Sequence, residues 1–451
     1  MPAPTRLLAA AAVTAAACLG VTAVPAASAV SAVSADATPQ SDAVVSRGVT
    51  IPTFYNPPAT LPAADGALVR SAPLPLALSL PGVDGPLPGT ATRLMYKSTD
   101  SAGRPMAVTG AYLEPSARWR GSGARPLVAV APGTMGQGDQ CAASLGLEHP
   151  LLVNGQTLSV GYEDLAIYRL LARGIAVVVT DYTGLGATDR LHTYVNRVDE
   201  AHAVLDAVRA ARSLDGTSLT AGSRVALFGY SQGGGATAAA AELQPSYAPD
   251  VTLAGTYSGA PPADLAAVTR AIDGSDLAGS LGWSVNGFLE SDPALAPIAE
   301  AHLNAAGRAA LKDLSTMCVG DALLAYNSVH SSTWTTDGRS ISDVVASEPA
   351  LKAFLADQRI GTREPTSPVR VATGTADDLV PHAQARALAV AWCAKGADVT
   401  YKPVIAPDLG RALINHFTPL LVDQTDAISW LTDRLNGRPT TSNCAALPLL
   451  P

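Results

Sequence analysis

One short segment restricts the fold of this chain more than any other feature. The apolar run at 225–228 leads directly into Gly-Tyr-Ser-Gln-Gly at 229–233, and an alanine-rich stretch follows. A strand, a Gly-x-Ser-x-Gly turn and a helix in this order are typical of a nucleophile elbow. Glycine at Gly229 and Gly233 lets neighbouring backbone pack against so tight a turn. The segment therefore predicts Ser231 as a nucleophile.

The acid that must support Ser231 is predicted in the loop after a later strand. A serine hydroxyl is a weak nucleophile at neutral pH, so it needs a histidine as general base and an acid that orients this histidine. In hydrolases with such an elbow, the acid and then the histidine follow the serine in the chain. The apolar run at 369–373 ends in a loop with two carboxylates. We predict Asp377 as the acid, with Asp378 as the alternative.

His416 is the predicted base. It follows the last predicted strand, 399–405, and precedes a helix predicted from Asp423, so we expect it in a loop that reaches the elbow. The other histidines after the nucleophile are predicted to lie at the surface or in packing contacts: His302, His330 and His382. The remaining ones precede the nucleophile: His149, His192 and His202.

Two backbone N–H groups are needed to hold the oxyanion of an acyl-transfer intermediate. Gln232, directly after the nucleophile, is predicted to supply one. The glycine-rich loop at 132–138 is predicted to supply the other, from Thr134 or alternatively Met135. This loop lacks the Gly-Lys-Ser/Thr ending of a nucleotide-binding P-loop, so we do not expect nucleotide binding.

Strand and helix patterns alternate along much of the chain and predict the α/β class. Runs at 91–97 and 105–114 predict a hairpin, after which short apolar runs and helical patterns alternate. This order favours a mostly parallel sheet with helices on both faces. The predicted parallel strands are 126–131, 175–180, 224–229, 251–256 and 368–373, and the helices are 162–173, 198–213 and 234–243.

The alternation stops after Pro262, and helical patterns such as 295–309 continue until it resumes at Pro368. We expect an inserted helical cap there. Its apolar residues Trp283, Phe288 and Leu289 are predicted to be core residues, with an acyl-binding pocket as the alternative. The predicted organisation is a signal peptide at 1–29, an extended segment at 30–88, the core at 89–262 and 365–451, and the cap at 263–364.

The first residues predict export. Arg6 precedes an uncharged apolar run at 7–24, and Ala-Ser-Ala at 27–29 fits signal peptidase cleavage. No later stretch approaches the roughly 20 apolar residues of a membrane span. We therefore expect a secreted, soluble protein without a stable membrane anchor, and a monomer.

Cysteines and charge narrow the possible ligands. In an oxidising compartment Cys141, Cys318, Cys393 and Cys444 predict two disulfides, for which three pairings are open. No two of them lie within four residues of each other, so a zinc site is not expected. The net charge is -8 and like charges form no block, which disfavours binding to nucleic acid or anionic lipid. We expect a neutral substrate, and no metal or organic cofactor.

These motifs resemble the secretory lipases typified by Candida-type lipase A, and in particular their exported actinobacterial members. The resemblance covers about 51–444 and rests on the elbow and on four further segments: Asp-Gln-Cys-Ala-Ala-Ser at 139–144, Asp-Tyr-Thr-Gly-Leu-Gly at 181–186, Asp-Asp-Leu-Val-Pro at 377–381, and Cys-Ala-Lys-Gly-Ala at 393–397.

The resemblance implies an α/β-hydrolase fold with a helical cap and a triad at Ser231, Asp377 and His416. It also implies disulfides between Cys141 and Cys318 and between Cys393 and Cys444. We therefore expect a secreted serine carboxylic-ester hydrolase, most of all a triacylglycerol lipase acting on neutral acyl esters, including lipid droplets or aggregates. The alternatives are a short-chain esterase, a polyesterase or an acyltransferase, then a serine peptidase or a non-catalytic binding protein.

Overall fold

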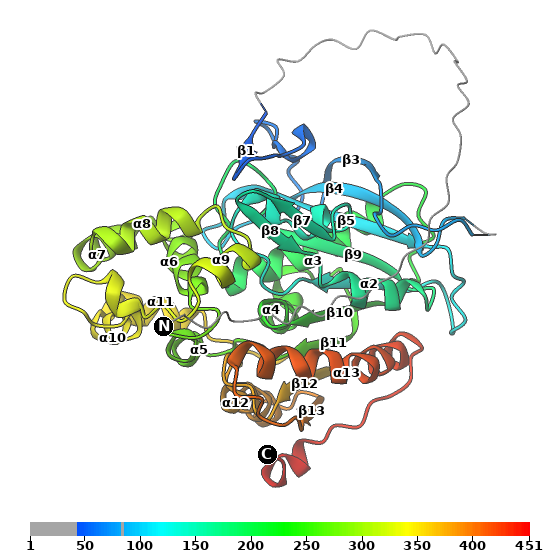
Figure 1. Cartoon of the computed structure of the whole chain (residues 1–451). Helices are drawn as coiled ribbons and strands as arrows, with labels where there is room; N and C mark the ends of the chain where they lie inside the picture. The colour runs from blue at the N-terminus through cyan, green and yellow to red at the C-terminus, as the bar shows by residue number, and fades with distance from the viewer. Residues whose placement is uncertain (1–42, 83–84) are drawn as a thin grey trace, which may run out of the picture. The chain divides into compact units, whose positions relative to one another are not determined.

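A single large sheet organises the protein. The computed structural model describes residues 43–82 and 85–451, so the signal peptide predicted at 1–29 lies outside the described residues. Nine of the described strands form this sheet, in the order β13-β12-β11-β10-β6-β9-β5-β4-β3 (Figure 1). Their bounds are β3 Leu68–Leu74, β4 Gly89–Thr99, β5 Pro105–Pro115, β6 Leu127–Ala131, β9 Ala176–Thr183, β10 Val225–Tyr230, β11 Leu253–Gly259, β12 Val369–Gly374 and β13 Val399–Val404.

The sheet is mostly parallel, as predicted. Strands β9, β6, β10, β11, β12 and β13 run parallel to their neighbours in that part of the sheet. Strands β4 and β5 form the predicted antiparallel hairpin, and β5 pairs antiparallel with β9. Continuous apolar runs suit the parallel strands because helices cover both of their faces.

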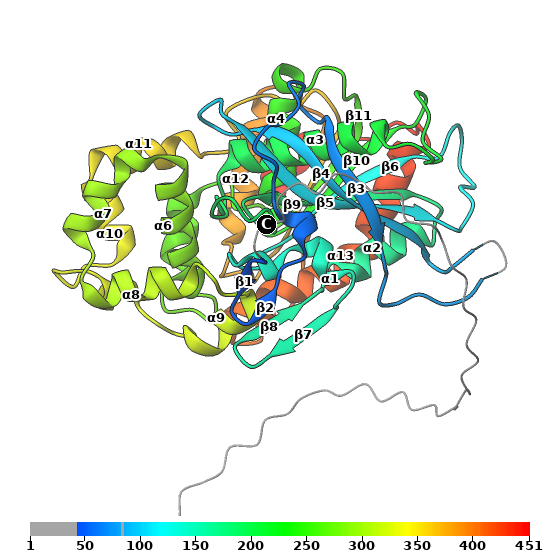
Figure 2. The same cartoon turned by 90° about the horizontal axis from the view of Figure 1, so that it is seen from above.

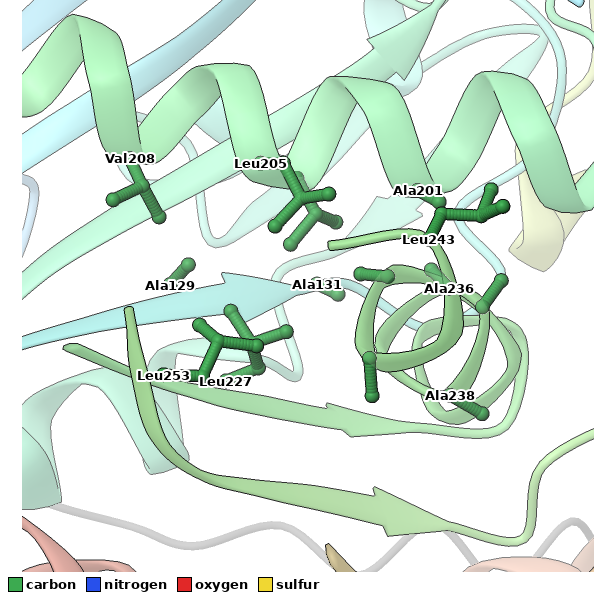
Figure 3. Packing of buried hydrophobic residues seen from close by; sticks show 14 of the residues in the cluster. Ala129, Ala131, Ala201, Leu205, Val208, Leu227, Ala236, Ala238, Leu243 and Leu253 are labelled. Carbon is green, nitrogen blue, oxygen red and sulfur yellow. The ribbon is translucent and has the colours of Figure 1, made fainter. Parts of the chain in front are cut away.

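Helices cover the sheet in two layers. On one face α3 (Arg197–Ser213), α4 (Gln232–Tyr247) and α12 (His382–Ala394) pack into one core cluster with the strands. On the other face α2 (Asp164–Leu171) and α13 (Ala412–Leu435) build a second cluster. Figure 3 shows Leu205 and Val208 of α3 pointing toward β6, and Ala131 of β6 in the same cluster as Ala236 of α4. These alanines let α4 approach the strand end at which Ser231 lies.

The segment between β11 and β12 folds into helices that share a core of their own. In Figures 1 and 2 the helices from α6 to α11 lie together beside the sheet. The bounds are α5 Leu265–Ile272, α6 Gly279–Ser291, α7 Ala296–His302, α8 Ala305–Leu314, α9 Val319–Ala325, α10 Ile341–Ser347 and α11 Pro349–Asp357.

The helical pattern at 295–309 forms two helices rather than one, because the chain leaves the helical conformation between α7 and α8. The Asn304 side chain accepts a hydrogen bond from the Gly307 backbone N–H at 2.9 Å and so caps α8. Asparagine favours such a cap over a helix interior.

The N-terminal segment predicted to be extended contributes a strand to the main sheet. Strand β3 pairs antiparallel with β4 at the sheet edge. Arg70, Ser71 and Pro73 interrupt its apolar alternation, and proline is tolerated at an edge because one side of the strand needs no partner. The other short elements are β1 Val45–Ser46, β2 Val49–Thr50, α1 Ala143–Gly146, β7 Leu151–Asn154 and β8 Thr157–Val160.

The prediction that His416 lies in a loop is wrong. Helix α13 begins at Ala412, well before the predicted start at Asp423, and His416 lies in its second turn. Helix α13 contains Pro419, although proline inside a helix removes one backbone hydrogen bond. Pro419 is buried and packs against Gly374, at which an added Cβ would lie 2.3 Å from the proline ring.

Two disulfides join distant segments. Cys141 is bonded to Cys318, which ties the loop after β6 to the helical insertion. Cys393 at the end of α12 is bonded to Cys444. The resemblance implied this pairing among the three that the cysteine count left open. Across 43–82 and 85–451, no helix has the length and apolarity needed to cross a membrane.

Replacing both Cys393 and Cys444 with serine is expected to lower the free energy of unfolding. The cross-link spans 51 residues and encloses α13, and the loop-entropy relation gives roughly 4 kcal/mol as an upper value for such a loop. Chemical denaturation of the oxidised wild type and of the double variant measures the difference. Equal unfolding midpoints would contradict a stabilising role for this bridge.

Candidate active site

Ser231 lies at the sharp turn between β10 and α4. Its φ of 58° is rare for a residue with a side chain, and such strain is concentrated at functional sites. Added Cβ atoms at Gly229 and Gly233 would lie 2.1 Å from Gly233 O and 1.9 Å from Ala131 O. Only glycine therefore permits this close packing, which agrees with the elbow predicted from the sequence.

Asp377 and His416 meet beside the elbow, although they come from different elements. His416 Nδ1 lies 2.8 Å from Asp377 Oδ2, and both side chains are buried. The backbone N–H groups of Leu379 and Val380 donate to Asp377 Oδ1 at 3.2 and 2.9 Å. The carboxylate is therefore fixed from both sides, whereas Asp378 is exposed.

The residue next to Ser231 holds the histidine close to the elbow. Tyr230 Oη donates to the backbone oxygen of His416 at 2.6 Å, and the two rings are 5.3 Å apart. With Nδ1–H directed at Asp377, His416 Nε2 is the unprotonated nitrogen. This atom is buried and has no hydrogen-bond partner within the described part of the chain. It is therefore available to accept a proton.

Thr134 and Gln232 line the same cavity as Ser231, whereas Met135 does not. Met135 packs in a cluster with Cys141 and Cys318, and its backbone oxygen accepts a hydrogen bond from Val319 at 2.8 Å. Gln232 is the first residue of α4, where backbone N–H groups lack partners within the helix. The geometry thus supports Thr134 over Met135 as the second oxyanion donor.

A buried carboxyl fixes the loop that carries Thr134. Gly133 N donates to Glu163 Oε1 at 2.7 Å, and Tyr162 Oη donates to Thr134 O at 2.9 Å. Burial raises the pKa of Glu163 to about 7. Sequence reasoning did not identify Glu163 or Tyr162, because their roles depend on contacts across the fold rather than on a local motif.

The histidines that were not assigned to catalysis occupy other positions. His382 lies 3.1 Å from Gly374 O and 3.0 Å from Tyr401 Oη, and His302 pairs with Glu348 at 2.8 Å. His192 had been set aside because it precedes the nucleophile. Its Nε2 nevertheless lies 3.1 Å from Gln232 Nε2, so it contacts the residue after Ser231.

Two adjoining cavities lead from Ser231 into the helical insertion. The first is lined by Ser231, Thr134 and Gln232 together with apolar residues of α5 and α6. The second lies among the helices of the insertion and includes Leu289. Both cavities are lined by Thr269, Leu281, Ser284 and Phe288. Of the apolar residues singled out in the sequence, Phe288 and Leu289 therefore face a cavity, whereas Trp283 is fully buried core.

Comparison with known proteins adds independent findings. The family model for secretory lipases matches residues 147–443. A probable inactive lipase of Mycobacterium tuberculosis is 31% identical over 398 residues, which cover 86% of this chain and 83% of that protein. A secreted triacylglycerol lipase of Malassezia furfur is 26% identical over 316 residues, which cover 68% of this chain and 60% of that protein.

Among solved structures, Candida antarctica lipase A in its closed state matches with a TM-score of 0.70. The identity is 20%, and the match covers 86% of this chain and 87% of that chain. This likeness concerns the fold, and it confirms the predicted α/β-hydrolase architecture.

Proposed function

The chain belongs to the secretory lipase family, a family of carboxylic ester hydrolases, and from this premise we propose that it is a secreted triacylglycerol lipase. Ser231, His416 and Asp377 form its catalytic triad. The observation that carries the proposal is the buried hydrogen bond between Asp377 and His416 next to the strained Ser231 turn. Nucleophile, base and acid have the chain order expected of this elbow.

In the proposed reaction His416 Nε2 accepts the proton of Ser231 Oγ while this oxygen attacks the ester carbonyl. The backbone N–H groups of Thr134 and Gln232 stabilise the oxyanion. His416 then donates the proton to the leaving alcohol, and an acyl-enzyme remains. The same histidine activates a water that hydrolyses it. Asp377 keeps the histidine in the required tautomer throughout.

We propose that the two adjoining cavities bind a long acyl chain of the substrate. Apolar side chains line both cavities along the way from Ser231 into the insertion. Such a lining suits a hydrocarbon chain rather than a charged group. The substrate is a neutral acyl ester in this proposal. We further propose that the protein acts as a monomer and binds no nucleic acid, which its net charge of -8 disfavours.

Export is part of the proposal. The leader pattern at 1–29 and the two disulfides support it, because disulfides persist in oxidising compartments. The name of the family agrees with this assignment.

The test is a hydrolysis profile of the purified mature protein. It should hydrolyse nitrophenyl esters of increasing chain length and emulsified triacylglycerol, but not a peptide amide. If the protein hydrolyses only short-chain esters, the function must be assigned as an esterase rather than a lipase.

The likeness to a probable inactive lipase makes a non-catalytic protein the second candidate. A protein that neither hydrolyses any ester nor reacts with a fluorophosphonate would establish that candidate.

Ser284 offers a variant that tests the acyl site. Ser284→Phe would fill the junction between the two cavities, so hydrolysis of long-chain esters should fall about tenfold or more relative to short ones. Ser284→Ala is the matched control, because it removes only a hydrogen bond to Ser280 O within α6. An unchanged chain-length profile in Ser284→Phe would place the acyl chain elsewhere.

A further inference from the structure

The side chain of Gln232 is held by two buried acceptors. Its Nε2 lies 2.8 Å from Glu200 Oε1 and 3.1 Å from His192 Nε2, and Gln232 is 2% exposed. His192 Nδ1 donates to Thr183 O at 2.8 Å, so its Nε2 is the accepting nitrogen. Both N–H groups of the Gln232 amide are therefore used, which fixes the side chain in one orientation.

The segment that provides these acceptors also contacts Thr134. Tyr194 Oη and Thr134 Oγ1 are 2.7 Å apart. Val195, which has a φ of 58°, donates its backbone N–H to Glu200 Oε1 at 3.0 Å. A single carboxyl oxygen thus joins the turn that carries Tyr194 to the side chain of Gln232.

We propose that residues 192–200 form a positioning element that sets both oxyanion donors, with Glu200 as its central positioning residue. The inference rests on the proposed function, since it assigns a role in the same reaction. Oxyanion donors act by being fixed before the charge develops, so small displacements weaken them. Glu200 links the Gln232 donor to the turn that contacts Thr134, and it has no contact with substrate in this role.

The helical insertion packs against this positioning element. Gln137 Nε2 donates to His192 O at 2.9 Å and to Trp283 O at 3.2 Å. Gly287 in α6 packs so closely that an added Cβ would lie 2.7 Å from Tyr194 N. His192, Tyr194 and Glu200 of the positioning element are buried, whereas Val195, Arg197 and Val198 are half-buried.

The charge state of the element suits its place beside an oxyanion. Burial raises the pKa of Glu200 to about 8 and lowers the pKa of His192 to about 4. Burial thus favours the neutral form of both side chains. The element therefore orients Gln232 without adding a negative charge that would oppose the oxyanion.

Glu200→Ala and Glu200→Gln test the proposal on the mature protein with a soluble ester. Glu200→Ala should reduce kcat about tenfold or more with KM within about twofold, because loss of oxyanion stabilisation acts on the transition state. Affinity for a trifluoromethyl ketone, whose adduct with Ser231 carries an oxyanion, should fall by a similar factor. Glu200→Gln keeps an acceptor oxygen and should retain most of the wild-type kcat.

Titration with a fluorophosphonate separates this role from a merely structural one. Labelling of Glu200→Ala should be slower than wild type but reach the same final fraction of sites. Asp206→Ala is the matched control: Asp206 is a buried acid on the same helix, and it bonds Ser98 and Tyr247 instead. This variant should lose stability but keep the wild-type kcat per titrated site.

Two results would overturn the inference: a wild-type kcat per titrated site in Glu200→Ala, or a kcat loss in Glu200→Gln as large as in Glu200→Ala. A wild-type protein that neither reacts with the fluorophosphonate nor turns over ester would instead reject the proposed function, so the two failures are distinguishable.

Discussion

Replacing Ser231 with alanine is expected to reduce ester hydrolysis by about 10⁴-fold or more without unfolding the protein. The substitution removes the Oγ that forms the acyl-enzyme but keeps the Cβ. The backbone contacts of the turn, including the 2.9 Å hydrogen bond from Ser231 N to Gly259 O, do not involve the hydroxyl. The chemistry should therefore be lost while the packing of β10 and α4 remains.

Hydrolysis of a soluble ester, together with a thermal unfolding curve, measures both parts of this prediction. Fluorophosphonate labelling of Ser231→Ala should be absent, and the unfolding temperature should stay close to that of the wild type. Turnover well above the expected residual level, in a preparation free of other esterases, would show that another group is the nucleophile.

The sequence predicted the centre of the sheet well because its signals there are local. Parallel strands such as β6 and β10 are buried on both faces and have continuous apolar runs, and the Gly-x-Ser-x-Gly turn has its own glycine requirement. Asp377 was predicted in the same way, since it follows a strand end, and it contacts His416 in the structure. Position along the chain was enough for these residues.

The errors arose where long-range contacts override local preference. His416 was placed in a loop because the helix was predicted only from Asp423, whereas α13 begins at Ala412 and runs through Pro419, which packs against Gly374. The contact of Glu200 and His192 with Gln232 has no local signal at all. Gln232 is 32 residues from Glu200 and 40 residues from His192 along the chain. A single sequence does not show that residues so far apart are in contact.

Asp377→Asn should reduce turnover by several orders of magnitude, about 10⁴-fold by analogy with other triads. Asp377 Oδ2 accepts the Nδ1–H of His416 at 2.8 Å, and Oδ1 accepts two backbone N–H groups. An asparagine must place its NH₂ against one of these two sets of donors. If its oxygen stays with the backbone, the NH₂ faces His416 Nδ1 and favours the tautomer with the proton on Nε2, which cannot accept the proton of Ser231.

Asp378→Asn is the matched control for this prediction, because it makes the same chemical change one residue along. Asp378 is exposed and is not bonded to His416, so turnover should stay within about threefold of wild type. Both variants should titrate with the fluorophosphonate to the same final fraction of sites, with Asp377→Asn far slower. The opposite ranking of the two variants would assign the acid to Asp378 and would require the loop after β12 to turn its other carboxylate toward His416.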